Sequence, residues 1–106
     1  MAYGKCLTFY YVQFRLLLNT SPDEFYLSIN DVKDAIIEVM GLNGTQYRKK
    51  ITLQVIEEGS TYVRGILDAN SKAEAQNYQK VFSSSYGRGD FIAGFEILSA
   101  SFATNI

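Results

Sequence analysis

The chain has 106 residues, of which 47% are hydrophobic, and this amount of apolar sequence suits one compact domain with one core. Ten Lys and Arg residues nearly balance eleven Asp and Glu residues, and the resulting net charge of -1 argues against a nucleic-acid backbone or an anionic membrane as partner. The single cysteine, Cys6, and the lack of histidine exclude an intrachain disulfide and a zinc cluster of Cys and His ligands, so we expect neither a metal nor a cofactor.

The first predicted elements are a strand and a helix. From Thr8 to Leu18 every second residue is apolar, which predicts a strand with one face on the core. Ser21-Pro22-Asp23-Glu24 then combines an N-cap serine, a proline at the first helical position and a capping-box glutamate. Apolar residues continue at helical spacing to Met40, and Gly41 follows as a stop signal. The sequence therefore predicts one helix that begins at Pro22.

A β-hairpin follows this helix. Apolar and polar residues alternate over 51–55 and again over 61–67, which predicts two strands. Thr61, Val63, Gly65 and Leu67 are expected to face the core. Gly59 lies between the two strands and predicts the turn that joins them.

A second helix and a last strand complete the predicted domain. Ser71 and Glu74 repeat the capping-box spacing, and an apolar stripe predicts a helix that runs to about Ser83. Residues 83–90 are small, polar or glycine, so they are expected to form an exposed loop. The last strand is predicted over roughly 94–102.

These elements predict one α+β domain over residues 1–106. The order β-α-β-β-α-β is that of the ferredoxin-like fold, in which an antiparallel sheet carries two helices on one face. Such a fold hosts RNA binders, ligand-sensing domains, small enzymes and extracellular modules, so the sites have to indicate the function.

The segment Glu57-Glu58-Gly59-Ser60 carries the most informative motif, because a serine that follows a strained glycine peptide could cut its own backbone. Without histidine, no set of nucleophile, base and orienting group can be written, so the chain is not expected to be an enzyme in the usual sense. Glu57 and Glu58 are neighbours on a strand, so their side chains point to opposite faces and cannot act as an acid and base pair.

The run Phe9-Tyr10-Tyr11-Val12-Gln13-Phe14-Arg15-Leu16, followed by a polar segment, a helix, a strand and then Gly59-Ser60 opening the next strand, resembles a SEA domain. SEA domains are extracellular modules of membrane mucins, proteoglycans, membrane-bound serine proteases and adhesion receptors. The family motif is typically Gly-Ser followed by three small β-branched residues, whereas Thr61, Tyr62 and Val63 follow here.

The resemblance implies an extracellular module for adhesion or spacing within a larger membrane-tethered or secreted protein. It also implies autoproteolysis in a single turnover: Ser60 Oγ would attack the Gly59 carbonyl carbon, the acyl group would shift from nitrogen to oxygen, and water would hydrolyse the ester. Strain in the folded hairpin would drive this reaction. In the simpler interpretation, Gly59 and Ser60 only form a turn.

Three further motifs suit a glycoprotein at the cell surface. Asn43-Gly44-Thr45 and Asn19-Thr20-Ser21 match the N-glycosylation pattern, and Asn43 is the better candidate because Pro22 directly follows the other site. Arg88-Gly89-Asp90 resembles the cell-attachment tripeptide read by integrins, which makes an integrin-type receptor a candidate protein partner. The simpler interpretation of this tripeptide is a glycine-rich turn with one charge of each sign.

Two other interpretations stay open. An intracellular ferredoxin-like domain would bind a small ligand or dimerise through a sheet edge. An RNA-recognition domain would place stacking aromatics where Tyr11 and Tyr62 stand, but 62–66 lacks the basic-glycine-aromatic signature, and we expect no nucleic-acid partner. The apolar stretch 6–18 is too short to cross a bilayer, so this domain is not expected to contact a membrane.

Overall fold

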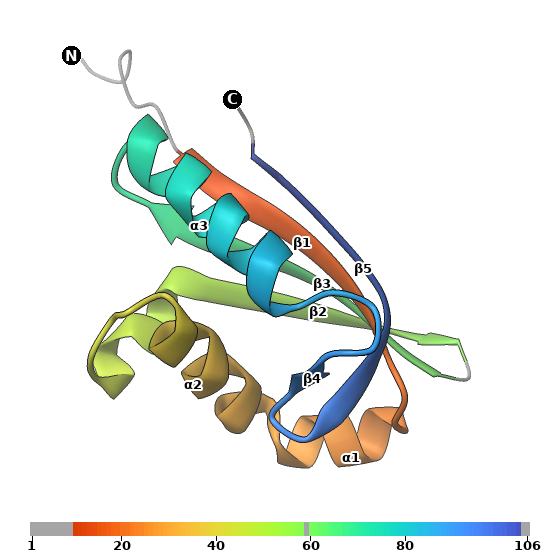
Figure 1. Ribbon diagram of the computed structural model, residues 1–106. Coiled ribbons are helices and arrows are strands. Elements are labelled where there is room, and N and C mark those ends of the chain that lie inside the picture. The colour runs from red at the N-terminus through yellow and green to blue at the C-terminus, as the bar shows by residue number, and fades with distance from the viewer. Residues whose placement is uncertain (1–9, 59, 105–106) are drawn as a thin grey trace, which may run out of the picture.

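The computed structural model describes residues 10–58 and 60–104, with the backbone alone described at 57, 58 and 60 (Figure 1). The predicted strand residues Thr8 and Phe9 therefore lie outside the described residues. In chain order the elements are β1 (Tyr10–Leu18), α1 (Pro22–Leu27), α2 (Ile29–Val39), the 3-10 helix η1 (Thr45–Lys50), β2 (Ile51–Glu58), β3 (Ser60–Ala69), α3 (Lys72–Ser85), β4 (Phe91–Ile92) and β5 (Phe95–Thr104).

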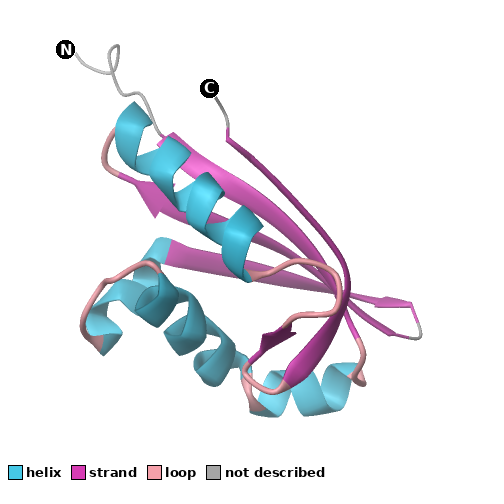
Figure 2. Ribbon diagram, viewed as in Figure 1, coloured by secondary structure: helices cyan, strands magenta, loops and turns pink. Residues whose placement is uncertain are grey.

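The described strands form one curled sheet in the order β2-β3-β1-β5-β4, and each pair of neighbours is antiparallel. Helices α1, α2 and α3 lie on one face of the sheet (Figure 2). The predicted α+β class, antiparallel sheet and one-sided helical layer are therefore confirmed. We call the face that carries the helices the inner face and the opposite one the outer face.

The predicted element order is wrong at one point, because the described part of the chain adds the short strand β4 before the last strand. Phe91 pairs with Glu96 and Ile92 with Phe95, across a turn formed by Ala93 and Gly94. Both turn residues have positive φ angles, 50° and 86°, which is the geometry of the tight turns that match the twist of a hairpin. The segment between the predicted loop and the last strand is thus a hairpin in its own right.

The single helix predicted from Pro22 is also wrong, because it is broken at Ser28. This residue ends α1 and begins α2, with φ -114° and ψ 15°, and its N–H donates to the Phe25 carbonyl. The predicted start is confirmed, since Ser21 Oγ accepts a hydrogen bond from the Glu24 N–H at 3.3 Å. The break redirects the chain while Phe25 of α1 and Val32 of α2 both reach the core.

The core lies between the inner face and the helices. β1 contributes every second residue, as predicted, and β3 contributes Val63 and Leu67 in the same phase. Phe14 of β1 packs on Phe82 of α3 with ring centroids 4.9 Å apart. Its ring also covers Gly65, its cross-strand partner, so closely that a Cβ atom there would overlap it. The least exposed large core side chains are Val12, Phe14, Leu16, Leu18, Phe25, Val32, Ile36, Val63, Leu67, Phe82, Ile92 and Ile97.

No helix covers the outer face in the part of the chain that the structure describes (Figure 1). By strand register, its positions with described side chains are Thr52, Gln54 and Ile56 on β2, Tyr62, Arg64, Ile66 and Asp68 on β3, Tyr11, Gln13, Arg15 and Leu17 on β1, and Ser99, Ser101 and Ala103 on β5. All of these residues are exposed or half-buried, so this face is accessible to a partner.

Candidate functional site

The predicted cleavage step lies at the closed end of the β2–β3 hairpin. The register pairs Glu57 with Thr61 and Glu58 with Ser60, so the ladder continues up to both sides of Gly59. Gly59 lies outside the described residues, and Ser60 is described as the first residue of β3. The predicted hairpin is therefore confirmed, whereas self-cleavage stays a prediction.

Thr61, which directly follows Ser60, is held firmly in place. Its side chain is completely buried, and its Oγ1 donates a hydrogen bond to the Thr20 carbonyl oxygen at 2.9 Å. The Thr61 N–H donates to the same oxygen at 3.2 Å. The connection between β1 and α1 thus fixes the chain one residue beyond the predicted scissile bond. The sequence had indicated only that Thr61 faces the core, because the partner is a backbone carbonyl distant in sequence.

Both predicted glycosylation asparagines are exposed in connections between elements. Asn43 lies between α2 and η1, next to Gly44 with its φ of 119°. Asn19 lies between β1 and α1, where its Nδ2 donates to Glu96 Oε1 at 3.4 Å. Access to an oligosaccharide is therefore simpler at Asn43, and glycosylation itself stays a prediction.

The tripeptide Arg88-Gly89-Asp90 is exposed, but it forms a tight turn rather than a free arm. The Asp90 N–H donates to the Gly87 carbonyl at 3.0 Å, and Gly89 has φ 90°, as the third residue of a type II turn requires. Asp90 Oδ2 accepts the Gly87 N–H at 2.7 Å. Backbone hydrogen bonds of 2.8 Å join Gly89 and Asp90 to Ile97 of β5. One oxygen of the aspartate is therefore engaged, and recognition by an integrin stays a prediction.

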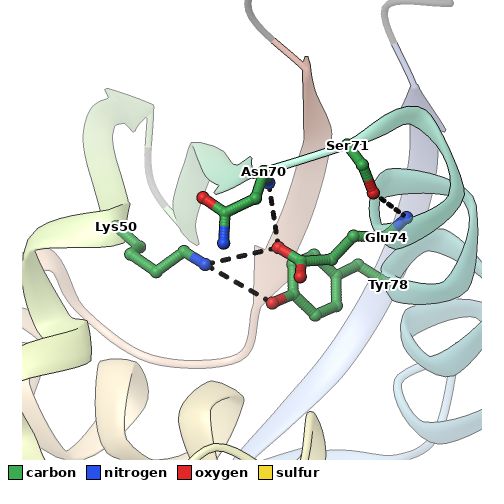
Figure 3. A network of polar contacts seen from close by, with 5 residues as sticks. All are labelled: Lys50, Asn70, Ser71, Glu74 and Tyr78. Carbon is green, nitrogen blue, oxygen red and sulfur yellow. Dashed lines mark hydrogen bonds and ion pairs between the residues drawn. The ribbon is translucent and has the colours of Figure 1, made fainter.

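A half-buried polar network joins the end of η1 to α3 (Figure 3). Lys50 Nζ lies 3.5 Å from both Glu74 Oε1 and the Tyr78 hydroxyl, and the Asn70 N–H donates to the same Glu74 oxygen at 2.9 Å. Ser71 caps α3 by accepting the Glu74 N–H at 3.1 Å, which confirms the predicted helix start.

The charges of this network indicate a structural role. Burial raises the pKa of the Tyr78 phenol, so it stays protonated at neutral pH. Burial also acts to raise the pKa of Glu74, but the hydrogen bonds from Asn70 and Tyr78 and the charge of Lys50 outweigh it, and the pKa lies below its usual value. The ionised carboxylate of Glu74 is thus paired with Lys50, and the network links η1 to α3.

Two arginines that lie far apart in the sequence are brought together by the sheet. Arg15 of β1 and Arg64 of β3 are direct cross-strand partners on the outer face, and both are exposed. Strand alternation alone places each arginine on that face, but their meeting depends on the register, which the sequence pattern did not provide.

Three general findings complete the description of the site. Within residues 10–58 and 60–104, no three His, Cys, Asp or Glu side chains lie close enough together to hold a metal ion. None of the described helices has the length and apolar character needed to span a membrane. Comparison of the chain with protein-family models, curated proteins and solved structures gave no match.

Proposed function

We propose that this chain is a SEA-like module of a larger cell-surface or secreted protein, and that it cleaves its own backbone once between Gly59 and Ser60. The observation that carries the proposal is how the two resulting halves would share the sheet. Strands β1 and β2 precede Gly59, whereas β3 and β5 follow it, and their spatial order is β2-β3-β1-β5. Each of the three long ladders would therefore join one half to the other (Figure 1).

This alternation supports a module that remains folded after its chain is cut. The halves would be held by the ladders and by a common core, so their separation would require mechanical force or a denaturant. With the short β4 set aside, the order of the four long strands also agrees with a ferredoxin-like arrangement, which we propose as the finer description of the fold.

The proposed chemistry uses the hairpin itself. Ser60 Oγ forms a bond to the Gly59 carbonyl carbon, the carbon–nitrogen bond breaks, and the hydroxyl proton passes to the released amine. Water then hydrolyses the ester, which leaves a carboxylate on Gly59 and restores the Ser60 hydroxyl. The β2–β3 ladder and the anchored Thr61 hold the chain on both sides of this bond, and distortion of order 1–3 kcal/mol would weaken its amide resonance.

Denaturing electrophoresis and mass spectrometry of freshly folded protein test the cleavage. We expect two fragments, 1–59 and 60–106, that elute as one species under native conditions. Ser60→Ala should abolish the cut, whereas Ser101→Ala, at an exposed serine of β5, should leave it unchanged. A wild-type chain that stays intact after folding contradicts the self-cleavage.

The proposed location is tested separately through the glycosylation motifs. The exposure of Asn43 supports a glycan there, so expression through a secretory pathway should yield a product that is shortened by glycosidase treatment. Asn43→Gln should remove this shift, and Asn19→Gln should leave most of it. A secreted product without any glycan would contradict the predicted glycoprotein, independently of the cleavage result.

We also propose that the module meets other proteins through exposed loops and surfaces, with an integrin-type receptor as one candidate at Arg88-Gly89-Asp90. The exposure of the tripeptide supports this partner. Adhesion of integrin-bearing cells to the immobilised domain should be lost in Asp90→Ala, and adhesion that survives this change would contradict the assignment.

A further inference from the structure

The centre of the outer face carries two positive charges side by side. Arg15 and Arg64 occupy directly opposed positions on the neighbouring strands β1 and β3. Their Cβ atoms are expected to lie about 4.5–5.5 Å apart, since this is the usual spacing of opposed residues in an antiparallel pair. Both side chains are exposed, so both guanidinium groups can reach a common ligand.

This arrangement is unfavourable in the isolated domain. Like charges directly opposed across a sheet repel each other, and an arginine presents up to five donors that need acceptors. Among the described residues, neither arginine forms an ion pair. The nearest outer-face acid along β3 is Asp68, four positions from Arg64 and therefore roughly 13 Å away along the strand. Within the side chains that the structure describes, the pair therefore has no carboxylate partner.

The surroundings of the pair are neutral and can form hydrogen bonds. Gln54 of β2 lies beside Arg64, and Ser101 of β5 lies beside Arg15, so one row across four strands reads Ser101, Arg15, Arg64, Gln54. A shallow hollow lies on each side of the pair, one over β1 and β5 and one over β2 and β3, and Gln13 lines both.

One neighbouring row is apolar. Leu17 of β1, Tyr62 of β3 and Ile56 of β2 are cross-strand neighbours, two positions along the strands from the arginine row. All three are half-buried although no described helix covers them. The outer face therefore combines a pair of exposed arginines with an apolar strip at its side.

We propose that the outer face, centred on Arg15 and Arg64, binds an acidic segment of a partner protein. One or two carboxylates of the segment accept hydrogen bonds from the two guanidinium groups, and an apolar side chain next to them packs on the strip of Leu17, Tyr62 and Ile56. Guanidinium and carboxylate groups match in planar shape, and their charge-assisted hydrogen bonds are stronger than those between neutral groups.

The charge distribution favours such a segment over a nucleic acid or a sulfated glycan. A polyanion carries a charge at every repeat and is bound by a track of cations. Among the outer-face positions whose side chains the structure describes, the arginine pair supplies the only cations, and Asp68 lies toward one end of the face.

A second copy of the chain is disfavoured for a different reason. A twofold interface brings the same patch of both subunits together. Outer faces packed in this way would confront two pairs of arginines, which would increase the repulsion rather than relieve it. The occupant is therefore a different surface, with carboxylates where this one has guanidinium groups.

Amide chemical shifts of the full-length domain can test this proposal. The probe is a synthetic dodecapeptide of serine and glycine that carries two glutamates and one leucine next to them, and its control is the same peptide with glutamine in place of glutamate. We expect the acidic peptide to shift outer-face amides of β1 and β3 at millimolar concentration or below. Arg15→Gln and Arg64→Gln should each weaken binding by about tenfold or more, which corresponds to one lost charge-assisted hydrogen-bonded contact.

Matched controls separate this site from general charge effects. Lys80→Gln removes an exposed cation from α3 and should leave the affinity for the acidic peptide unchanged. Rising salt should weaken binding by the wild type and have little effect on the double arginine variant. The preserved amide spectrum of each variant shows that it is folded.

Several results would overturn the proposal. The first is that the acidic peptide does not change the amide chemical shifts of the outer face. The second is that the glutamine peptide binds as tightly as the acidic one. The third is that the shift changes are confined to the helices. If a heparin fragment or an oligonucleotide binds this face more tightly than the acidic peptide, the ligand is a polyanion and the proposed protein segment is wrong.

Discussion

Thr61→Val tests the anchoring of the hairpin, because it removes one hydroxyl and preserves the shape of the side chain. In the structure this hydroxyl is completely buried and donates to the Thr20 carbonyl at 2.9 Å. Valine fills the same space and leaves no unpaired donor behind. The Thr20 oxygen retains the Thr61 N–H, at 3.2 Å, as a partner. The substitution therefore removes one buried hydrogen bond and little else.

The magnitude follows from this geometry. A neutral intramolecular hydrogen bond contributes about 0.5–1.5 kcal/mol net, so we expect Thr61→Val to lower the free energy of unfolding by about 1 kcal/mol. For a domain near this size, that loss lowers the Tm by roughly 4–8 °C. If the anchored Thr61 also maintains the strain on the Gly59–Ser60 peptide, losing about 1 kcal/mol of it would slow cleavage about fivefold.

Two assays measure the two effects. Urea unfolding is followed in a Ser60→Ala background, because an uncut chain allows a two-state analysis. The cleavage rate is followed by electrophoresis after refolding of the chain with Ser60 intact. Thr52→Val, at an exposed threonine of β2, is the control and should change stability by no more than about 0.5 kcal/mol. Undiminished stability in Thr61→Val would refute the hydrogen-bond argument, and lost stability with an unchanged cleavage rate would refute Thr61 as a source of strain.

Three further predictions concern the sheet and its supports. Gly65→Ala should destabilise the domain by about 1–3 kcal/mol in urea unfolding, because the added methyl group overlaps the buried Phe14 ring; a neutral result would mean that the ring can move aside. Arg15→Gln should raise stability by about 0.2–1 kcal/mol at low salt by relieving the repulsion from Arg64, and a gain that does not shrink with salt would contradict this origin. The Arg48 guanidinium donates hydrogen bonds to the Asp34 carboxylate and lowers the pKa of Asp34. The ion pair therefore stabilises the fold above the pKa that Asp34 has in the unfolded chain, and this contribution is lost as the pH falls through the pKa of Asp34 in the folded chain. Thermal melts of Asp34→Asn from neutral to acid pH should show a weaker pH dependence than the wild type, and identical slopes would count against the ion pair.

The parts of the fold that follow local rules could be predicted from the sequence. The alternation in β1 placed Val12, Phe14, Leu16 and Leu18 on the core side, and all four are buried. The serine and glutamate spacing located the start of α3, where Ser71 accepts the expected hydrogen bond. In each case a period or a cap within a few residues determines the structure.

The parts that depend on backbone geometry could not be predicted in this way. Apolar spacing continues through Ser28, so the pattern contains no sign of the break that its φ and ψ produce. The tight turn before β5 requires a positive φ at Ala93, a conformation that alanine rarely adopts and that a sequence reading would not assign to it. At Ser28 and at Ala93, tertiary packing determines the backbone conformation and overrides the local preference of the sequence.

The candidate sites also divide into a part that follows from local sequence patterns and a part that depends on the tertiary structure. The sequence located the Gly59-Ser60 step in a hairpin, because both flanking strands alternate clearly. Thr61 and the arginine pair act through partners that lie far away in the chain, and these contacts appear only when the strands are placed in register. A charge at an outward position of each central strand is a usable signal, but the sequence pattern did not indicate which charges would be opposed.

The two proposed sites are connected through β3. If the chain is cut after Gly59, Arg15 belongs to the first fragment and Arg64 to the second, so the anion site consists of one arginine from each. A partner bound to both arginines would then hold the fragments together, because it binds only the assembled pair and stabilises it by mass action. By the same linkage, force that separates β1 from β3 would divide the site and release the partner. Cleavage would thus convert a permanent binding surface into one that exists only while the two fragments stay paired.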